Sequence, residues 1–132
     1  ATGMTDRVLG RIVDAKIAYE DHGILTCFIG FDFGGSNQGF GDYPLDTWDE
    51  TEKRRVGTAA GMEFLIGVMA AVGVESWDAL LGKEVWIERE EGNSGWEKIV
   101  VIEAPAYRKH TRKFDVREWQ RKWTGSDGKV KV

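Results

Sequence analysis

The sequence is poor in the residues that build disulfides and metal centres. Its 132 residues include one cysteine, Cys27, and two histidines, His22 and His110. A single cysteine excludes a disulfide framework within the chain, and no CxxC or HxxxH spacing is present to hold structural zinc. The acids near glycines also lack the spacing of a calcium loop. We therefore expect no metal and no cofactor, and the scarcity of cysteine favours a reducing, intracellular setting.

Long apolar runs are absent as well. No segment reaches the roughly 18 uncharged residues that a membrane span needs, and the N-terminus shows no basic-then-apolar signal sequence. We therefore expect a cytoplasmic protein without membrane contact. At 42% hydrophobic and 30% charged, the composition is that of one globular domain with a single core.

The patterns of catalysis and nucleotide binding are missing too. The glycines match neither the Walker loop nor the Rossmann fingerprint. Cys27 lies in an apolar strand pattern, where a thiol behaves as a small hydrophobe. The pair Asp21-His22 lies in a turn, where aspartate commonly bonds its own backbone. These absences favour a non-enzymatic protein, since a hydrolase or nuclease would need a metal or histidine cluster.

The periodicity of apolar residues predicts an α+β fold. A single antiparallel sheet of about five strands packs on one main apolar helix, and a basic helix follows near the C-terminus. In the first strand, Val13, Ala15, Ile17 and Tyr19 are expected to form the apolar face. The expected elements are strands at 7–19, 24–33, 38–45, 83–91 and 96–103, with helices at 58–72 and 115–123.

The helix expected at 58–72 is apolar nearly all round. Thr58 is suited to its N-cap and Gly73 to the left-handed position that ends it. Glu63 is its one charge, so the helix is buried on several sides or lies at a subunit contact. Its small residues would let another backbone approach closely. We favour a core helix on its own sheet, and the same features predict a homo-oligomer.

Charge is unevenly spread along the chain, whose net charge is −4. We divide it into an acidic α+β core (1–106), a basic aromatic segment (107–123) that belongs to the same domain or is an appendage, and a flexible tail (124–132). Rings alternating with cations are typical of single-stranded nucleic acid platforms. The alternative is an amphipathic helix docked by its tryptophans, with cations paired to the acidic body. The candidate nucleic-acid contacts are Arg108, Lys109, Arg112, Lys113, Arg117, Trp119 and Arg121.

Five glycines and several aromatic rings lie in the stretch 30–43, which reads GFDFGGSNQGFGDY. A basic run follows at 53–55. Such a segment brings backbone and flat rings close to a partner, which suits nucleobases and phosphates or a protein hot spot. The structural alternative is that the glycines permit bulges in a curved sheet and the rings are core. The candidate contact residues are Phe31, Phe33, Phe40, Tyr43, Trp48, Lys53, Arg54 and Arg55.

Four runs resemble a family of small phage and prophage proteins without an assigned function. The resemblance covers roughly residues 11–88 and supplies no catalytic residues, and the basic C-terminal region departs from the family pattern. The runs are EDHGILT (20–26), DFGGSNQGFG (32–41), GTAAGMEF (57–64) and VGVESW (72–77).

The resemblance implies a phage context, in which small single-domain proteins often bind and disable host machinery. We therefore hypothesise a binding protein inside the bacterial cell that inhibits a defence system. It would bind a host protein or sequester a small nucleotide signal. The alternative hypothesis is a nucleic-acid-binding accessory protein that uses the basic C-terminal segment.

Overall fold

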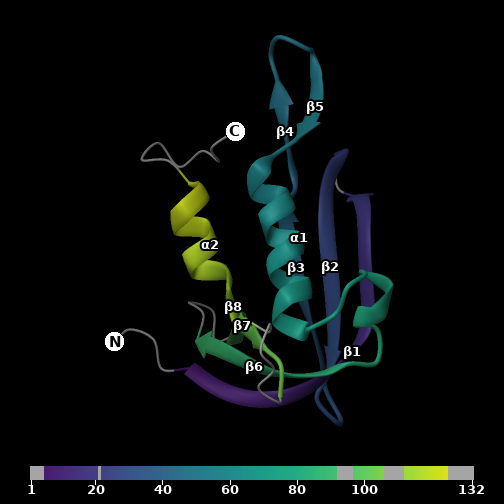
Figure 1. Ribbon diagram of the computed structural model, residues 1–132, viewed down its shortest axis with the longest axis vertical. Coiled ribbons are helices and arrows are strands. Elements are labelled where there is room, and N and C mark those ends of the chain that lie inside the picture. Colours follow the sequence, from purple (N-terminus) through teal and green to yellow (C-terminus); the bar gives the residue numbers. More distant parts are fainter. Residues whose placement is uncertain (1–4, 21, 92–96, 106–111, 125–132) are drawn as a thin grey trace.

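The computed structural model describes residues 5–20, 22–91, 97–105 and 112–124 (Figure 1). Its described elements, in chain order, are β1 (Thr5–Glu20), β2 (Ile24–Asp32), β3 (Asn37–Pro44), β4 (Asp46–Asp49), β5 (Arg54–Gly57), α1 (Ala59–Val72), the 3-10 helix η1 (Asp78–Leu80), β6 (Glu84–Glu91), β7 (Glu97–Glu103), β8 (Phe114–Asp115) and α2 (Val116–Trp123). The predictions for Arg108, Lys109 and most of the tail concern residues outside the described ranges.

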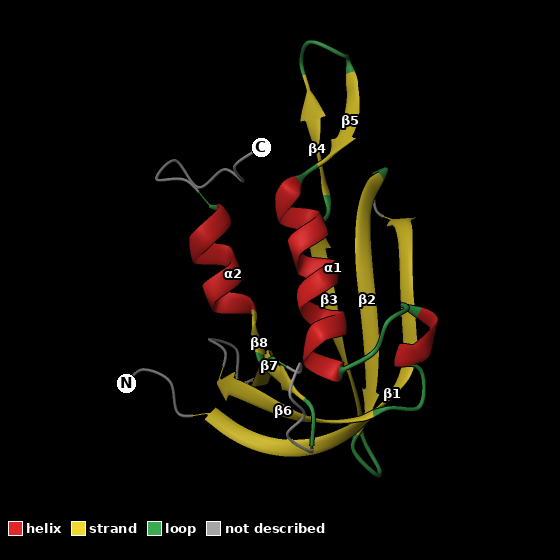
Figure 2. Cartoon of the chain, in the orientation of Figure 1, coloured by secondary structure: helices red, strands yellow, loops and turns green. Residues whose placement is uncertain are grey.

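A six-stranded antiparallel sheet forms the frame, in the order β3-β2-β1-β6-β7-β8. The long strand β1 joins its two halves: residues 5–11 pair with β6, and residues 11–20 pair with β2. Figure 2 shows β1 curving between these partners, so that the two halves of the sheet run in different directions. The α+β prediction is confirmed. The polar stretch after Pro44 forms a separate ribbon, β4–β5, that the sequence pattern did not predict.

A bulge in β1 changes which of its residues face the core. Ile12 lies opposite Phe31, but the next pair is Asp14 with Gly30, so Val13 is an extra residue without a partner in β2. The insertion turns Ile12 into the core, where it is buried, and leaves Val13 exposed. The predicted alternation is therefore wrong at Val13, because a bulge shifts the two-residue period by one.

Helix α1 begins and ends where its capping residues predict. The Thr58 hydroxyl accepts a hydrogen bond from the Gly61 N–H at 2.9 Å and donates one to the Leu45 carbonyl. Gly73 ends the helix at φ 87°. The close approach that its small residues predicted is intramolecular: Gly61 lies against the Leu45 backbone, and Gly67 lies against the Phe114 ring.

The described part of the basic C-terminal segment is docked on the body. Strand β8 pairs with β7, and α2 lies alongside α1 (Figure 1). The Trp119 ring packs edge-on against Phe64, with 5.0 Å between the two ring centroids. Its Nε1–H donates a hydrogen bond to the Ala60 carbonyl at 2.8 Å. Val116 is completely buried. In residues 112–124, the docking alternative therefore describes the structure.

Candidate binding site

Several rings of the glycine–aromatic segment lie in the core. Phe31 is 0% exposed and Phe40 4%, so neither offers a ring face to a partner. Tyr43 packs between Phe64 and Trp119, and burial raises the pKa of its hydroxyl. The structural alternative holds for these three rings, because Phe31 and Phe40 are core residues and Tyr43 is partly buried against the core.

The remaining candidates of this segment do not form one site. Phe33 lies just beyond the end of β2, whereas the basic run lies on the β4–β5 ribbon. Figure 1 shows the connection between β2 and β3 at the bottom of the molecule and the ribbon at its top. The glycine turn and the basic run therefore cannot hold one small ligand between them.

A shallow hollow of about 320 Å³ lies beside the glycine turn. Arg11 is opposite Asp32 on one side of β1 and opposite Glu84 on the other, so two acids flank one cation. The Gly34 N–H is already bonded to the Asp32 carboxylate at 2.9 Å. This charge pattern disfavours a phosphate. The lining residues are Leu9, Gly10, Arg11, Asp32, Phe33, Gly34 and Glu84.

The β4–β5 ribbon carries the other candidate residues. Arg55 is bound inward by the buried Asp46 carboxylate at 2.8 Å, which leaves it little freedom to contact a partner. Lys53 and Arg54 are exposed, and the Trp48 side chain is 49% exposed. On the ribbon, these three residues are the part of the predicted contact region that remains accessible.

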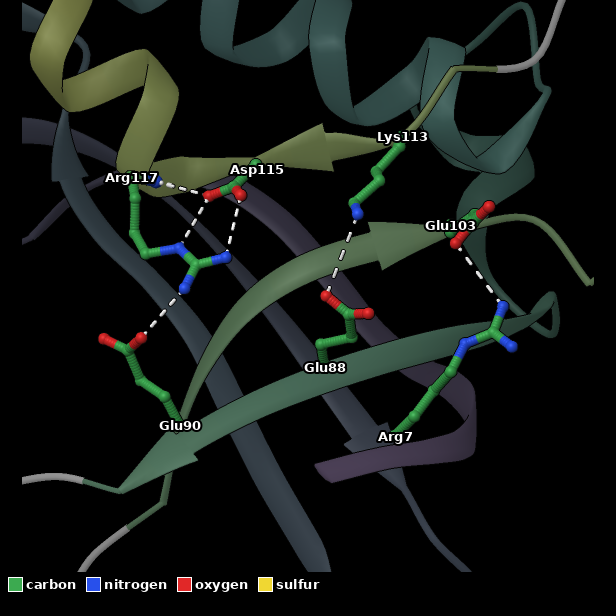
Figure 3. A network of polar contacts seen from close by, with 7 residues as sticks. All are labelled: Arg7, Glu88, Glu90, Glu103, Lys113, Asp115 and Arg117. Carbon is green, nitrogen blue, oxygen red and sulfur yellow. Dashed lines mark hydrogen bonds and ion pairs between the residues drawn. The ribbon is translucent and has the colours of Figure 1, made fainter. Parts of the chain in front are cut away.

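Cations of the C-terminal segment are neutralised by acids of the sheet (Figure 3). Arg117 contacts Glu90 at 3.0 Å and Asp115 at 2.9 Å, and Lys113 lies 4.0 Å from Glu88. Trp119, another predicted contact, is occupied by docking. Because these groups already have partners, the geometry gives little support to a nucleic-acid platform. Arg112 and Arg121 remain exposed.

The Asp115–Arg117 pair makes stability sensitive to acid. Burial alone would raise the pKa of Asp115, but hydrogen bonds and the charge of Arg117 outweigh it and lower this pKa below its ordinary value. A lowered folded-state pKa means that the stabilisation is present above the unfolded pKa of about 4 and is lost as pH falls through the folded pKa.

We therefore expect the free energy of unfolding to fall between about pH 5 and pH 2, and to fall less in Asp115→Asn. Asparagine keeps an N-cap oxygen, so the variant should retain α2. Denaturant melts across this pH range measure the effect. An identical acid dependence in both proteins would show that the pair is energetically silent.

A second hollow is a groove between α1 and α2. Its volume is about 220 Å³. Gly67, Ala70 and the Phe114 ring contribute apolar surface, while Glu63, Glu118 and Lys122 add charge. Ile66 borders the groove and is 47% exposed, and Met62 lies one turn before it on α1. The remaining lining residues are Arg112, Lys113, Asp115, Trp119 and Trp123.

Comparison with known proteins gives no match, either to a protein-family model, to a curated protein or to a solved structure. Function therefore has to be argued from the geometry of the described residues. Within them, no group of three metal-ligating side chains occurs, and no helix has the length and apolarity to cross a membrane. Cys27 is buried, and burial raises its pKa to about 12, so its thiol is a poor nucleophile.

The sequence pattern missed this groove for an identifiable reason. A helix that is apolar nearly all round predicts burial on several sides without saying which side stays open, and α1 is covered by the sheet on one face and by α2 on a flank. Met62 and Ile66 consequently remain exposed. The signal was present as apolar residues at i and i+4, but it did not distinguish the core face from the open face.

Proposed function

We propose that the chain is a non-enzymatic binding protein that takes an amphipathic segment of a partner protein into the groove between α1 and α2. The observation that carries the proposal is the open apolar stripe of Met62 and Ile66 beside that groove. Protein interfaces combine an apolar centre with a polar rim, and an amphipathic helix binds by laying its apolar face into a hydrophobic groove. Lys122, Glu118 and Glu63 supply such a rim.

The resemblance to phage proteins points to a bacterial protein as the partner. On that basis the chain would act as an antagonist of a host defence system, by occupying a surface that the host protein needs. This finer role rests on the resemblance alone. Sequestration of a nucleotide signal is less favoured, because the hollow beside the glycine turn is lined by two acids and one cation.

The test immobilises the wild type and two variants and compares which proteins each one captures from a bacterial lysate. Ile66→Asp places a carboxylate in the apolar stripe, and desolvating it should weaken partner capture at least about tenfold. Leu81→Asp is the matched control, because Leu81 is 54% exposed and lies in the chain after η1, outside the groove lining. Both variants should melt like the wild type, since neither side chain is buried.

Support requires a protein that the wild type and Leu81→Asp retain and Ile66→Asp loses. Equal retention by all three proteins would place the contact elsewhere and overturn the proposal. The same conclusion follows if purified captured protein binds Ile66→Asp as tightly as wild type in a titration.

A further inference from the structure

Half of strand β1 forms an open edge of the sheet. Strand β6 pairs with β1 only as far as Arg11, and Ile12 is bonded to the Lys83 carbonyl and the Gly82 N–H. Within the described part of the chain, residues 14–20 pair with β2 alone. Figure 2 shows this half of β1 at the margin of the sheet, with β2 on its inner side.

The hydrogen bonds of Leu25 show which backbone groups of this edge point outward. Its N–H donates to the Asp46 carboxylate and its carbonyl accepts from the Leu45 N–H, so both groups face away from β1. In an antiparallel pair, directly opposite residues either exchange both hydrogen bonds or point all four groups away from each other. Tyr19 lies opposite Leu25, and it must therefore direct its N–H and carbonyl to the open edge.

The two-residue period extends this orientation along the strand. Ile17 lies opposite Cys27 and Ala15 opposite Ile29, so their backbone groups also point outward. Apolar side chains on this edge are uncovered, since Ile17 is 40% exposed and Tyr19 is 70% exposed. Natural edges are usually protected by proline, by bulges or by inward charges. Residues 14–20 contain no proline and lie beyond the one bulge of the β1–β2 pair.

We propose that this edge binds a second copy of the chain by antiparallel pairing of β1 with β1. Ile17 then lies opposite Tyr19 of the second copy, with Ala18 at the two-fold axis. The outward N–H and carbonyl groups of both residues form hydrogen bonds across the axis. The two sheets join into one continuous sheet, with an isologous interface.

Charge complementarity selects this register. If the pairing were centred before Ile17, the strand of the second copy would extend to Ile12. Lys83 already pairs with that part of the edge. A pairing centred on Ile17 places Asp14 opposite Glu20, and like charges directly opposite are destabilising. Centring on Ala18 instead places Lys16 opposite Glu20 of the second copy. A pairing centred beyond Ala18 uses fewer residues of each strand.

Sedimentation velocity over a concentration series up to about 1 mM tests the pairing. The wild type should dimerise as concentration rises, whereas Tyr19→Pro should remain a monomer over the same range. Proline removes an N–H that points away from β2, so the β1–β2 ladder and the melting temperature should be kept. A monomeric wild type, or a Tyr19→Pro dimer of unchanged affinity, would overturn the proposal.

Charge variants test the register. Lys16→Glu and Glu20→Lys should each weaken the dimer several-fold, and the double exchange should restore it, because opposite charges again face each other. Both residues are exposed, and their 2.8 Å ion pair within one chain contributes little to folding. If Glu20→Lys strengthens the dimer, the strands are centred on Ile17 and the register is wrong. Loss of the dimer in Ile66→Asp but not in Tyr19→Pro would assign self-association to α1 instead.

Discussion

Replacing Gly61 by alanine is expected to lower the free energy of unfolding by about 3 kcal/mol, although alanine is the better helix former. A Cβ at this position would meet the Leu45 carbonyl and its Cα, both of them backbone atoms. The helix would have to move away from the β3–β4 connection, which also breaks the bond from the Thr58 hydroxyl to the Leu45 carbonyl. Helix propensity alone would stabilise the variant by roughly 1 kcal/mol. The sign of the measured change in the free energy of unfolding therefore shows whether propensity or the steric clash is larger.

Two other glycines serve as controls. Gly57→Ala adds a Cβ that meets nothing within 4 Å, and its stability should change by less than about 0.5 kcal/mol. Gly67→Ala meets the Phe114 ring, a side chain that is able to shift, so its loss should lie between the other two. Thermal melts measure all three, and about 3 kcal/mol corresponds to roughly 10 °C. A Gly61→Ala protein as stable as wild type would mean that α1 tolerates displacement from the sheet.

Local sequence signals predicted the elements that local chemistry determines. Thr58 and Gly73 bracket α1 because a side-chain cap and a positive φ act within one turn. The strands on either side of the turn at Gly23 were placed almost to the residue for the same reason. The bulge at Val13 left no local signal, because it depends on how β1 divides its pairing between β2 and β6. The β4–β5 ribbon after Pro44 was not predicted, because its polar composition lacks the apolar alternation that indicates a strand.

The candidate contact residues were harder to predict, since exposure is a tertiary property. Phe31 and Phe40 lie in the same glycine-rich stretch as Phe33, yet both are buried, whereas Phe33, which lies at the turn, is only partly buried. The cations near the C-terminus look like a binding surface until β8 places Lys113 and Arg117 over the acids of β6. Pairing between segments distant in sequence therefore decides which charges are available.

Replacing Trp119 by alanine is expected to cost about 3 to 5 kcal/mol and to loosen α2 from the body. The indole contacts both Phe64 and Tyr43, and its Nε1–H bonds the Ala60 carbonyl. Truncation leaves a cavity beside two rings, and the remaining α2 is too short to be stable alone. If instead α2 were an appendage, the variant would keep the melting temperature of the wild type.

Two further variants separate packing from the hydrogen bond. Trp119→Phe keeps a ring in the site but loses the donor, and should cost about 1 to 2 kcal/mol, because the Ala60 carbonyl retains the bond that its helix supplies. Trp48→Ala removes a tryptophan that is 49% exposed on the ribbon, and should leave stability within about 0.5 kcal/mol of wild type. Equal losses in Trp119→Ala and Trp48→Ala would contradict the argument. A larger loss of stability in Trp119→Ala than in Trp119→Phe is the expected result. It would show that ring packing, more than the hydrogen bond, holds the C-terminal helix to the core.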